Sequence, residues 1–319
     1  ANNLEDSGCA VALVTTGDRL TLGSPTALAS YTAADRRIAS RPTVAVSPDG
    51  RATVAWDVFN AMTGQFEIQV GRGRKLGDQG GTPVVTVAQG TVAAPTLTFG
   101  PKGNLLVGWL EWDASLKADQ GGRVRVATSA DGVTFDPAVT LGETGIGFGR
   151  VMGAMPDRGA GPNLSLAVDK NGSVYASYAG AGEGMDLYLV RSDDNGRSWS
   201  APTVVNDITK GDQFHPALAV DASGTVVVSY YDTRNSSSGG EVDVYLARST
   251  NRGVSFGASE RVTTRSSNDS VTNPNRDAAA NLGSRIGVAA TANGVFVVWT
   301  DTRNGNEDVY FSQRAGTSS

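Results

Sequence analysis

Residues 215–230 read HPALAVDASGTVVVSY, and this stretch indicates the fold of the chain. Leu218 and Val220 alternate with smaller residues before a turn at 221–224, and an apolar run then leads to Tyr230. Side chains along a β-strand alternate between two faces, and Asp, Ser and Gly together mark a tight turn. The stretch therefore predicts an antiparallel hairpin whose second strand ends in an aromatic residue.

The same hairpin pattern occurs five times in the sequence. The copies are 41–56 (RPTVAVSPDGRATVAW), 94–109 (APTLTFGPKGNLLVGW), 161–178 (GPNLSLAVDKNGSVYASY), 215–230 and 284–299 (SRIGVAATANGVFVVW). A third strand follows each hairpin, as in 243–247 (DVYLA), and a fourth short strand follows in some copies, as in 201–205 (APTVV). Repeated units of four antiparallel strands are typical of the blades of a β-propeller.

Three copies continue from the third strand into a turn of fixed spacing. These turns are 192–199 (SDDNGRSW), 249–256 (STNRGVSF) and 128–135 (TSADGVTF), and the last lacks the acid in this alignment. The pattern Ser-x-Asp-x-Gly-x-x-Trp resembles the Asp-box of the sialidase superfamily of β-propellers, also called BNR-repeat proteins. The resemblance extends over residues 41 to 313 and implies an all-β, sialidase-like propeller with six four-stranded blades, although only five inner hairpins are visible.

We expect the Asp-box residues to fold these turns and not to take part in chemistry. Ser and Asp side chains accept hydrogen bonds from the N–H groups of the turn, glycine supplies a positive φ, and the aromatic residue packs beside the next blade. The residues concerned are Ser192, Asp194, Gly196 and Trp199 in the first box, and Ser249, Gly253 and Phe256 in the second.

The first 40 residues also carry strand pattern, for example 9–14 (CAVALV) and 25–30 (PTALAS). They form either a reduced sixth blade or the outer strand that closes the last blade, so the sequence predicts a single propeller domain over residues 1–319. The chain begins ANN without a charged and apolar leader, which fits a mature exported protein. We therefore expect a secreted protein, either extracellular or periplasmic.

Composition excludes several classes of function. The chain has one His, one Cys and a formal net charge of −5, so it cannot form a His- or Cys-based zinc site or an internal disulfide. Without a basic run it is not expected to bind nucleic acid, and it lacks the roughly 18 apolar residues that a membrane span needs. No cofactor is expected, except that the oxygen-rich loop 301–308 (DTRNGNED) is compatible with a structural Ca²⁺.

The longer, polar connections are predicted to lie on one face, because the turns of a four-stranded meander alternate between two faces. Loops on a rigid scaffold commonly carry function. Arginines there suit an anionic ligand, since guanidinium matches a carboxylate in bidentate fashion. The candidate ligand-binding residues are Arg41, Arg150, Arg158, Arg276 and Arg285, with Trp112 for stacking on a sugar ring and His215 for a hydrogen bond.

The resemblance to sialidases further implies an arginine triad, a Tyr nucleophile assisted by a Glu, and an Asp acid/base. Carried onto this sequence, the nucleophile falls to Tyr231, the assisting Glu to Glu241 or Glu111, and the acid to Asp157 or Asp232. Arg41-Pro42 and Arg285-Ile286 match only part of the family's Arg-Ile-Pro. Asp232-x-Arg234 and Asp301-x-Arg303 repeat at one register in two blades. We expect them to bridge strands, because a catalytic residue is needed once and not in each blade.

Two functions remain open from the sequence. The first is a propeller that binds a glycan, an anionic sugar or an extracellular protein partner through its loop-rich face without catalysis. The alternative is an exo-acting glycoside hydrolase of sialidase type that cleaves terminal anionic sugars. The catalytic set is only partly matched by motifs and a fold does not by itself confer activity, so the sequence favours the binding protein.

Overall fold

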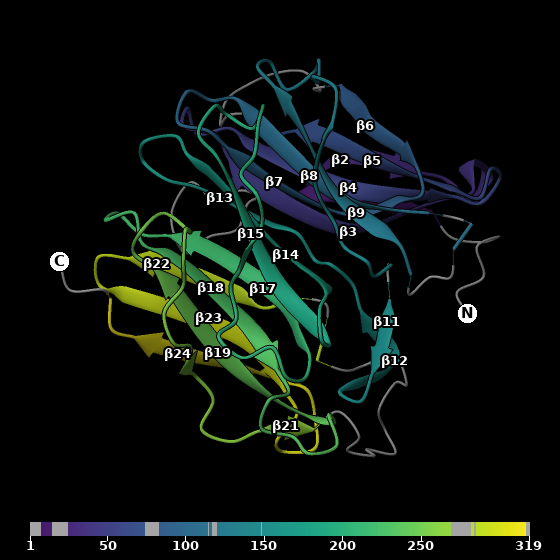
Figure 1. Cartoon of the computed structure of the whole chain (residues 1–319). Coiled ribbons are helices and arrows are strands. Elements are labelled where there is room, and N and C mark those ends of the chain that lie inside the picture. Colours follow the sequence, from purple (N-terminus) through teal and green to yellow (C-terminus); the bar gives the residue numbers. More distant parts are fainter. Residues whose placement is uncertain are drawn as a thin grey trace. The chain divides into compact units, whose positions relative to one another are not determined.

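The computed structural model describes residues 8–14, 25–73, 83–113, 115–116, 120–147, 149–268, 282–283 and 285–316. The side chains of Asp157 and Arg158 lie outside this description. The described residues form β-strands and one short 3₁₀ helix, η1 (Ala33–Asp35). They divide into two compact units: unit 1 is Ala1–Glu111 with Arg125–Val139, and unit 2 is Trp112–Val124 with Thr140–Ser319 (Figure 1).

Unit 1 begins with an antiparallel pair, β1 (Cys9–Leu13) and β2 (Thr26–Tyr31). A four-stranded sheet follows, made of β3 (Arg37–Val46), β4 (Ala52–Asn60), β5 (Gln65–Arg72) and β6 (Val84–Gly90). The next sheet has β7 (Val92–Phe99), β8 (Leu105–Trp112), β9 (Gly122–Ser129) and β10 (Val139–Glu143), and some of its residues belong to unit 2. Val11 packs with Trp56, so the first hairpin contributes to the core of the unit.

Unit 2 contains a small hairpin, β11 (Arg150–Met152) with β12 (Met155–Ala160), and three larger sheets. The first of these has β13 (Ser165–Val168), β14 (Val174–Ala181), β15 (Met185–Ser192) and β16 (Thr203–Val204). The second has β17 (Gln213–Val220), β18 (Val226–Asp232), β19 (Glu241–Ser249) and β20 (Glu260–Arg261), with β21 (Ser267–Asn268) also on β19. The third has β22 (Gly287–Thr291), β23 (Gly294–Asp301) and β24 (Asp308–Arg314).

The five predicted hairpins are all present, as β3–β4, β7–β8, β13–β14, β17–β18 and β22–β23. The predicted all-β fold of four-stranded antiparallel sheets is therefore confirmed. The number of blades, the single domain over residues 1–319 and the closing role of residues 1–40 stay predictions.

The Asp-box turns have the predicted hydrogen bonds. In the first box, Ser192 Oγ accepts the Gly196 N–H at 2.8 Å, Asp194 Oδ1 accepts the Ser198 N–H at 2.8 Å, and the Trp199 indole N–H donates to Gly196 O. In the second box, Gly253 has a φ of +78° and donates its N–H to Ser249 Oγ at 2.9 Å. These groups are fully engaged in the turn, so a folding role accounts for them.

The third box corrects the sequence alignment. Asp131, one residue nearer the glycine than expected, accepts the Thr134 N–H at 2.7 Å and the Ser129 hydroxyl at 3.0 Å. Ser129 Oγ in turn accepts the Gly132 N–H at 2.8 Å. The acid is therefore present in a turn that is one residue shorter, and its backbone hydrogen bonds lower the Asp131 pKa to about 2.

The core of unit 2 surrounds β18, in which every residue is buried. Its run of Val226, Val227 and Val228 packs with Leu187 and Leu246 of neighbouring strands. A strand covered on both faces reads as a continuous apolar run, which explains why this segment lacks the alternation of β17.

Candidate functional site

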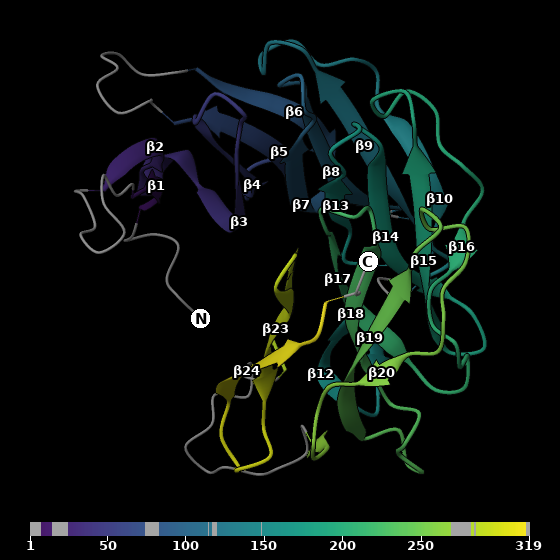
Figure 2. The same cartoon turned by 90° about the vertical axis from the view of Figure 1, so that its left-hand side faces the viewer.

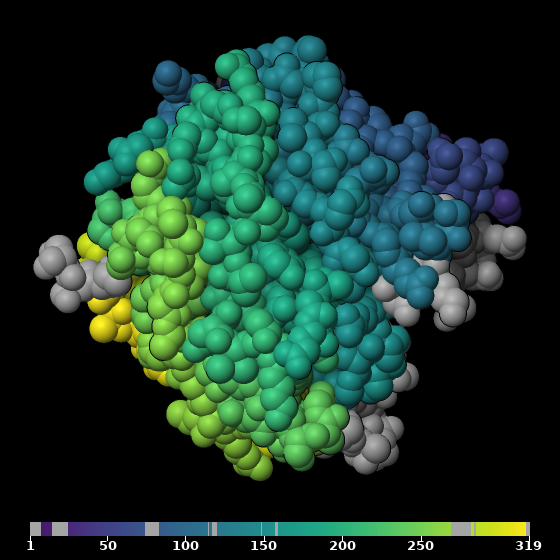
Figure 3. Space-filling view, viewed as in Figure 1, coloured from purple at the N-terminus to yellow at the C-terminus, as the bar shows by residue number. Residues whose placement is uncertain are grey.

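Within unit 2 the long connections gather on one side, as predicted, and we call this side the loop face. It comprises the β11–β12 hairpin and residues 182–184, 205–212, 233–240, 262–268 and 302–307. Arg150 donates to Gly184 O at 2.9 Å, the Asp212 N–H donates to Thr233 Oγ1 at 2.8 Å, and the Thr302 hydroxyl donates to Asn268 O at 2.9 Å. Green and yellow-green segments of this unit form the lower surface in Figure 3. These contacts join neighbouring loops of the unit in pairs.

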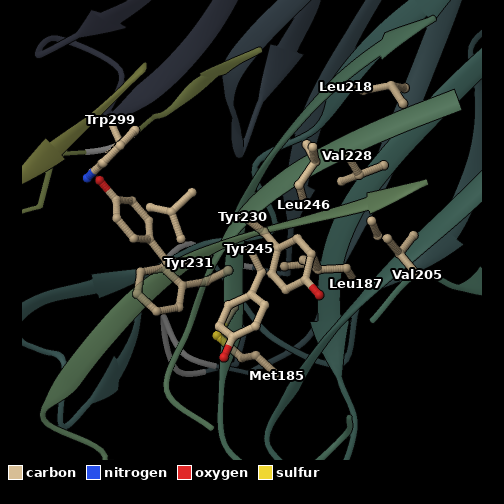
Figure 4. Close-up of a cluster of buried hydrophobic side chains, with 14 of the residues drawn as sticks. Met185, Leu187, Val205, Leu218, Val228, Tyr230, Tyr231, Tyr245, Leu246 and Trp299 are labelled. Atoms are coloured by element: carbon tan, nitrogen blue, oxygen red, sulfur yellow. The ribbon is translucent and has the colours of Figure 1, made fainter. Parts of the chain in front are cut away.

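Tyr231, the predicted nucleophile, lies in the core and not on the loop face. Its side chain is 1% exposed and stacks on Phe214 with ring centroids 5.4 Å apart. The hydroxyl donates to Thr300 O at 2.7 Å and accepts the Thr300 N–H at 3.1 Å, and it points toward Trp299 (Figure 4). Burial raises the pKa of the phenol above its usual range. The predicted nucleophilic role does not fit this position, because a substrate cannot reach the oxygen.

The predicted arginines that the structure describes differ in their surroundings. Arg41, in unit 1, pairs through Nε with the buried carboxylate of Asp57 at 2.6 Å. Arg150 binds the Gly184 carbonyl within the loop face, whereas Arg285 is exposed. Arg276 and the side chains of Arg158 and Asp157, the predicted acid, lie outside the described residues.

The remaining predicted residues are dispersed. Glu241 is exposed at the start of β19 and pairs across the strands with Asn268, and Trp112 is partly buried at the end of β8. His215 is 3% exposed, with the ring edges of Phe214 and Tyr231 against it at 5.0 and 6.0 Å between centroids. His215 is thus a buried neighbour of Tyr231, which does not fit the predicted hydrogen bond to a ligand.

The innermost strands share a backbone feature that sequence reasoning missed. Arg41, Ala94, Asn163 and His215 occupy the same place in four sheets, and their φ values are +50°, +53°, +43° and +51°. In three of these sheets the strand register shifts at this point. A left-handed residue at a β-bulge bends the end of the strand. In three copies a proline follows this residue, and that proline could have indicated the bulge from the sequence.

The repeated Asp-x-Arg motifs are structural, as predicted. Arg234 Nε donates to Asp232 at 2.8 Å, and the guanidinium lies 4.1 Å from the centroid of Tyr245. Arg303 binds Asp301 at 2.8 Å and lies 4.5 Å from the centroid of Tyr310. Each arginine thus neutralises a buried carboxylate and covers an aromatic ring of the third strand.

Calcium binding by residues 301–308 stays a prediction. The Asp301 carboxylate accepts hydrogen bonds from Arg303 and from the Trp299 indole N–H at 2.9 Å. Across the described ranges, no group of three or more His, Cys, Asp or Glu residues has the placement to hold a metal ion. In the same part of the chain, no helix is long and apolar enough to cross a membrane.

Asp186, in β15 beside the loop face, has an unusual environment that the sequence analysis did not single out. Asp186 and Asp243 lie near the start of the third strand in successive sheets. Asp243 binds the Arg261 guanidinium at 2.6 Å, whereas the 5% exposed Asp186 accepts its hydrogen bond from the amide of Asn206 at 2.7 Å. Burial raises the pKa of Asp186, and the charges of Glu183 and Asp212 add to this effect.

A pair of glycines in the sequence could have indicated the environment of Asp186. Gly180 lies opposite Asp186, where Asp232 lies opposite Asp243 in the next sheet, and Gly182 follows at the place of Arg234. A side chain at Gly182 would collide with the Asp186 carboxylate. The loop backbone therefore occupies the place that the Arg234 guanidinium has in the next sheet. The negative charge of Asp186 is consequently not compensated by an arginine at this place.

We expect Asp186→Asn to change how stability depends on pH. The native protein binds a proton more tightly here than the unfolded chain, whose carboxyl has the ordinary pKa of 3.8, so wild-type stability falls as pH rises above that value. The variant lacks this fall and gains stability relative to wild type as pH rises above the ordinary pKa of 3.8, as urea unfolding would measure. Equal pH slopes for variant and wild type would contradict the assignment.

Asp194→Asn is the matched control with the opposite sign. Hydrogen bonds from Ser198 and Ser192 lower the Asp194 pKa to about 2, so the ionised form is favoured in the native state. Its contribution is present above the ordinary value and is lost as pH falls toward 2. This variant therefore loses stability relative to wild type as pH rises, whereas Asp186→Asn gains it.

Comparison with known proteins identifies a shared fold. No family model and no curated protein sequence matches the chain. A protein of unknown function from Dyadobacter fermentans has 14% identity and a TM-score of 0.57 over 88% of this chain and 80% of its own. The α-L-arabinanase of Penicillium chrysogenum, complexed with arabinobiose, has 13% identity and a TM-score of 0.57 over 88% and 79%.

The NanB sialidase of Streptococcus pneumoniae, as its K499G mutant, has 8% identity and a TM-score of 0.53 over 87% of this chain and 61% of the sialidase. At these identities the similarity defines the fold alone. It agrees with the four-stranded antiparallel sheets of both units, so the chain shares an all-β propeller fold with these proteins.

Proposed function

We propose that the protein binds a glycan or a protein partner through the loop face of unit 2, without catalysis and outside the cytoplasm. The observation that carries the proposal is the burial of Tyr231, whose hydroxyl is hydrogen-bonded to the Thr300 backbone. A Tyr/Glu mechanism of sialidase type needs an accessible phenol. The fold shared with an arabinanase and a sialidase supports a glycan as the ligand.

The exposed groups of the loop face suit recognition of a polyhydroxylated or anionic sugar. Arg265 and Lys210 are exposed on the loop face and offer N–H donors for hydroxyl or carboxylate oxygens. Glu183 and Glu241 are exposed acceptors for sugar hydroxyls. Rigid strands beneath the loops reduce the entropy lost on binding.

An exo-acting glycoside hydrolase of sialidase type is the second candidate. The raised pKa of Asp186 favours it, because a carboxyl that holds its proton is suited to donate it to a leaving group. This role requires the loop 182–184 to move, since Asp186 is only 5% exposed. In this candidate Asp186 replaces Asp157 as the acid, and Tyr231 is not the nucleophile. Its activity would be lost in Asp186→Asn.

Binding of labelled anionic and neutral oligosaccharides to charge-matched variants tests the proposal. Arg265→Ala and Lys210→Ala remove exposed cations from the loop face, and Arg197→Ala removes an exposed arginine from an Asp-box turn. We expect the two loop-face variants to weaken binding about tenfold or more, which corresponds to about 1.4 kcal/mol, and Arg197→Ala to leave it unchanged. Equal affinities for all four proteins would reject the loop face as the binding surface.

A further inference from the structure

The last sheet of unit 2 has one strand fewer than its neighbours. The sheets that begin with β3, β7 and β13 have four strands, whereas β22, β23 and β24 form a sheet of three. One edge of β24 pairs with β23, and no strand among the described residues pairs with its other edge (Figure 2). An open edge presents a row of N–H and C=O groups that can pair with another strand.

One face of this sheet is apolar and exposed. Val298 and Phe311 are directly opposite each other on β23 and β24, so their side chains share a face, and Val309 lies two residues from Phe311. Val298, Phe311 and Val309 are 39%, 64% and 78% exposed. The other face, with Val297 and Trp299, is buried in the core of the unit. The exposed apolar face therefore continues to the open edge.

The sequence of β24, DVYFSQR, is complementary to itself when two copies run antiparallel. A two-fold axis at Phe311 places Asp308 opposite Arg314 of the second copy at both ends of the paired strands. Within its own chain Arg314 also pairs with Glu260 at 2.9 Å, so it would bind a carboxylate of each copy. The axis also places Phe311 opposite Phe311 of the second copy, on the apolar face that contains Val309. Neither Lys nor Pro, residues that commonly protect edge strands, occurs in β24.

From these observations we propose that two copies of the chain pair along β24 and form one continuous antiparallel sheet across the two-fold axis. The interface is isologous, since each copy supplies the same strand. Cross-strand contacts join the Phe311 rings, opposite charges meet at both ends, and the open edge gains its missing neighbour. This association does not depend on the ligand bound at the loop face.

The mass of the protein in solution tests the proposal. Sedimentation equilibrium of the full chain at about 100 µM is expected to give twice the 32.9 kDa of one copy. Val309→Lys and Phe311→Lys introduce a charge at exposed positions, so both variants should fold and sediment as monomers. Val254→Lys changes an equally exposed valine on an Asp-box turn and should remain dimeric.

A charge exchange distinguishes edge pairing from any other dimer. Asp308→Arg and Arg314→Asp should each weaken association at least tenfold, because like charges then meet at both ends. Mixing the two variants restores opposite pairs and should restore a heterodimer. A monomeric wild type, or a dimer that is unchanged by Phe311→Lys, would overturn the proposal. Slow amide exchange of β24 in a monomer would show that the same chain covers the edge, and this too would overturn it.

Discussion

Tyr231→Ala is expected to lower the free energy of unfolding of unit 2 by about 3 to 5 kcal/mol, the cost of removing a large buried aromatic side chain. The ring is 1% exposed and packs with Phe214, and its loss would leave a cavity beside Trp299. It would also leave the N–H and C=O of Thr300 without the hydroxyl that both now contact. Urea unfolding followed by tryptophan fluorescence would measure the change.

Tyr231→Phe removes the hydroxyl and keeps the ring, so it measures the contribution of the hydroxyl alone. It should cost about 1 to 3 kcal/mol, because the partly buried backbone groups of Thr300 lose a partner while the packing is retained. Tyr188→Phe is the control, since the Tyr188 hydroxyl donates to Ala181 O at an exposed position, and it should cost less than about 1 kcal/mol. A cost below about 1 kcal/mol for Tyr231→Ala would mean that the residue is not part of the core.

Asp301→Ala is expected to destabilise unit 2 by about 3 to 5 kcal/mol, the range for a buried ion pair that loses one partner. The Asp301 side chain is 0% exposed and that of Arg303 only 11%. Removal of the carboxylate leaves the guanidinium uncompensated, and it also leaves the buried Trp299 indole N–H without its acceptor. Thermal unfolding followed by circular dichroism would measure the loss.

The control for Asp301→Ala is an ion pair of the same chemistry at the surface. Asp193 and Arg252 are 49% and 51% exposed, so Asp193→Ala should change stability by about 1 kcal/mol or less. If the two substitutions had equal effects, the Asp301–Arg303 ion pair would not stabilise the fold as a buried pair should. A functional role for Asp301 would then have to be reconsidered.

Much of the fold could be predicted from the sequence because its signals are local. The hairpin glycines, the Asp-box spacing and the strand alternation each depend on a few neighbouring residues, and the observed hydrogen bonds of Ser192, Asp194 and Ser249 follow from them. The alignment of the box at Ser129 was wrong only because Asp131 stands one residue closer to the glycine.

The candidate site was less predictable because exposure depends on packing between sheets. Alternation places Tyr230 and Tyr231 on opposite faces of β18, but both faces of this strand are covered, so neither tyrosine is accessible. Likewise, the chemistry of Asp186 depends on Asn206, and on the absence of an arginine in a loop that two glycines make compact. No spacing along the chain encodes those contacts.

The most direct test of binding without catalysis is the release of 4-methylumbelliferone from its sialoside by the wild type and by Tyr231→Phe, from about pH 4 to pH 8. With the phenol buried against Thr300, we predict no release above background by either protein, while oligosaccharide binding at the loop face persists in both. Turnover by the wild type that Tyr231→Phe abolishes would contradict the account, because Tyr231 would then be the nucleophile of an enzyme.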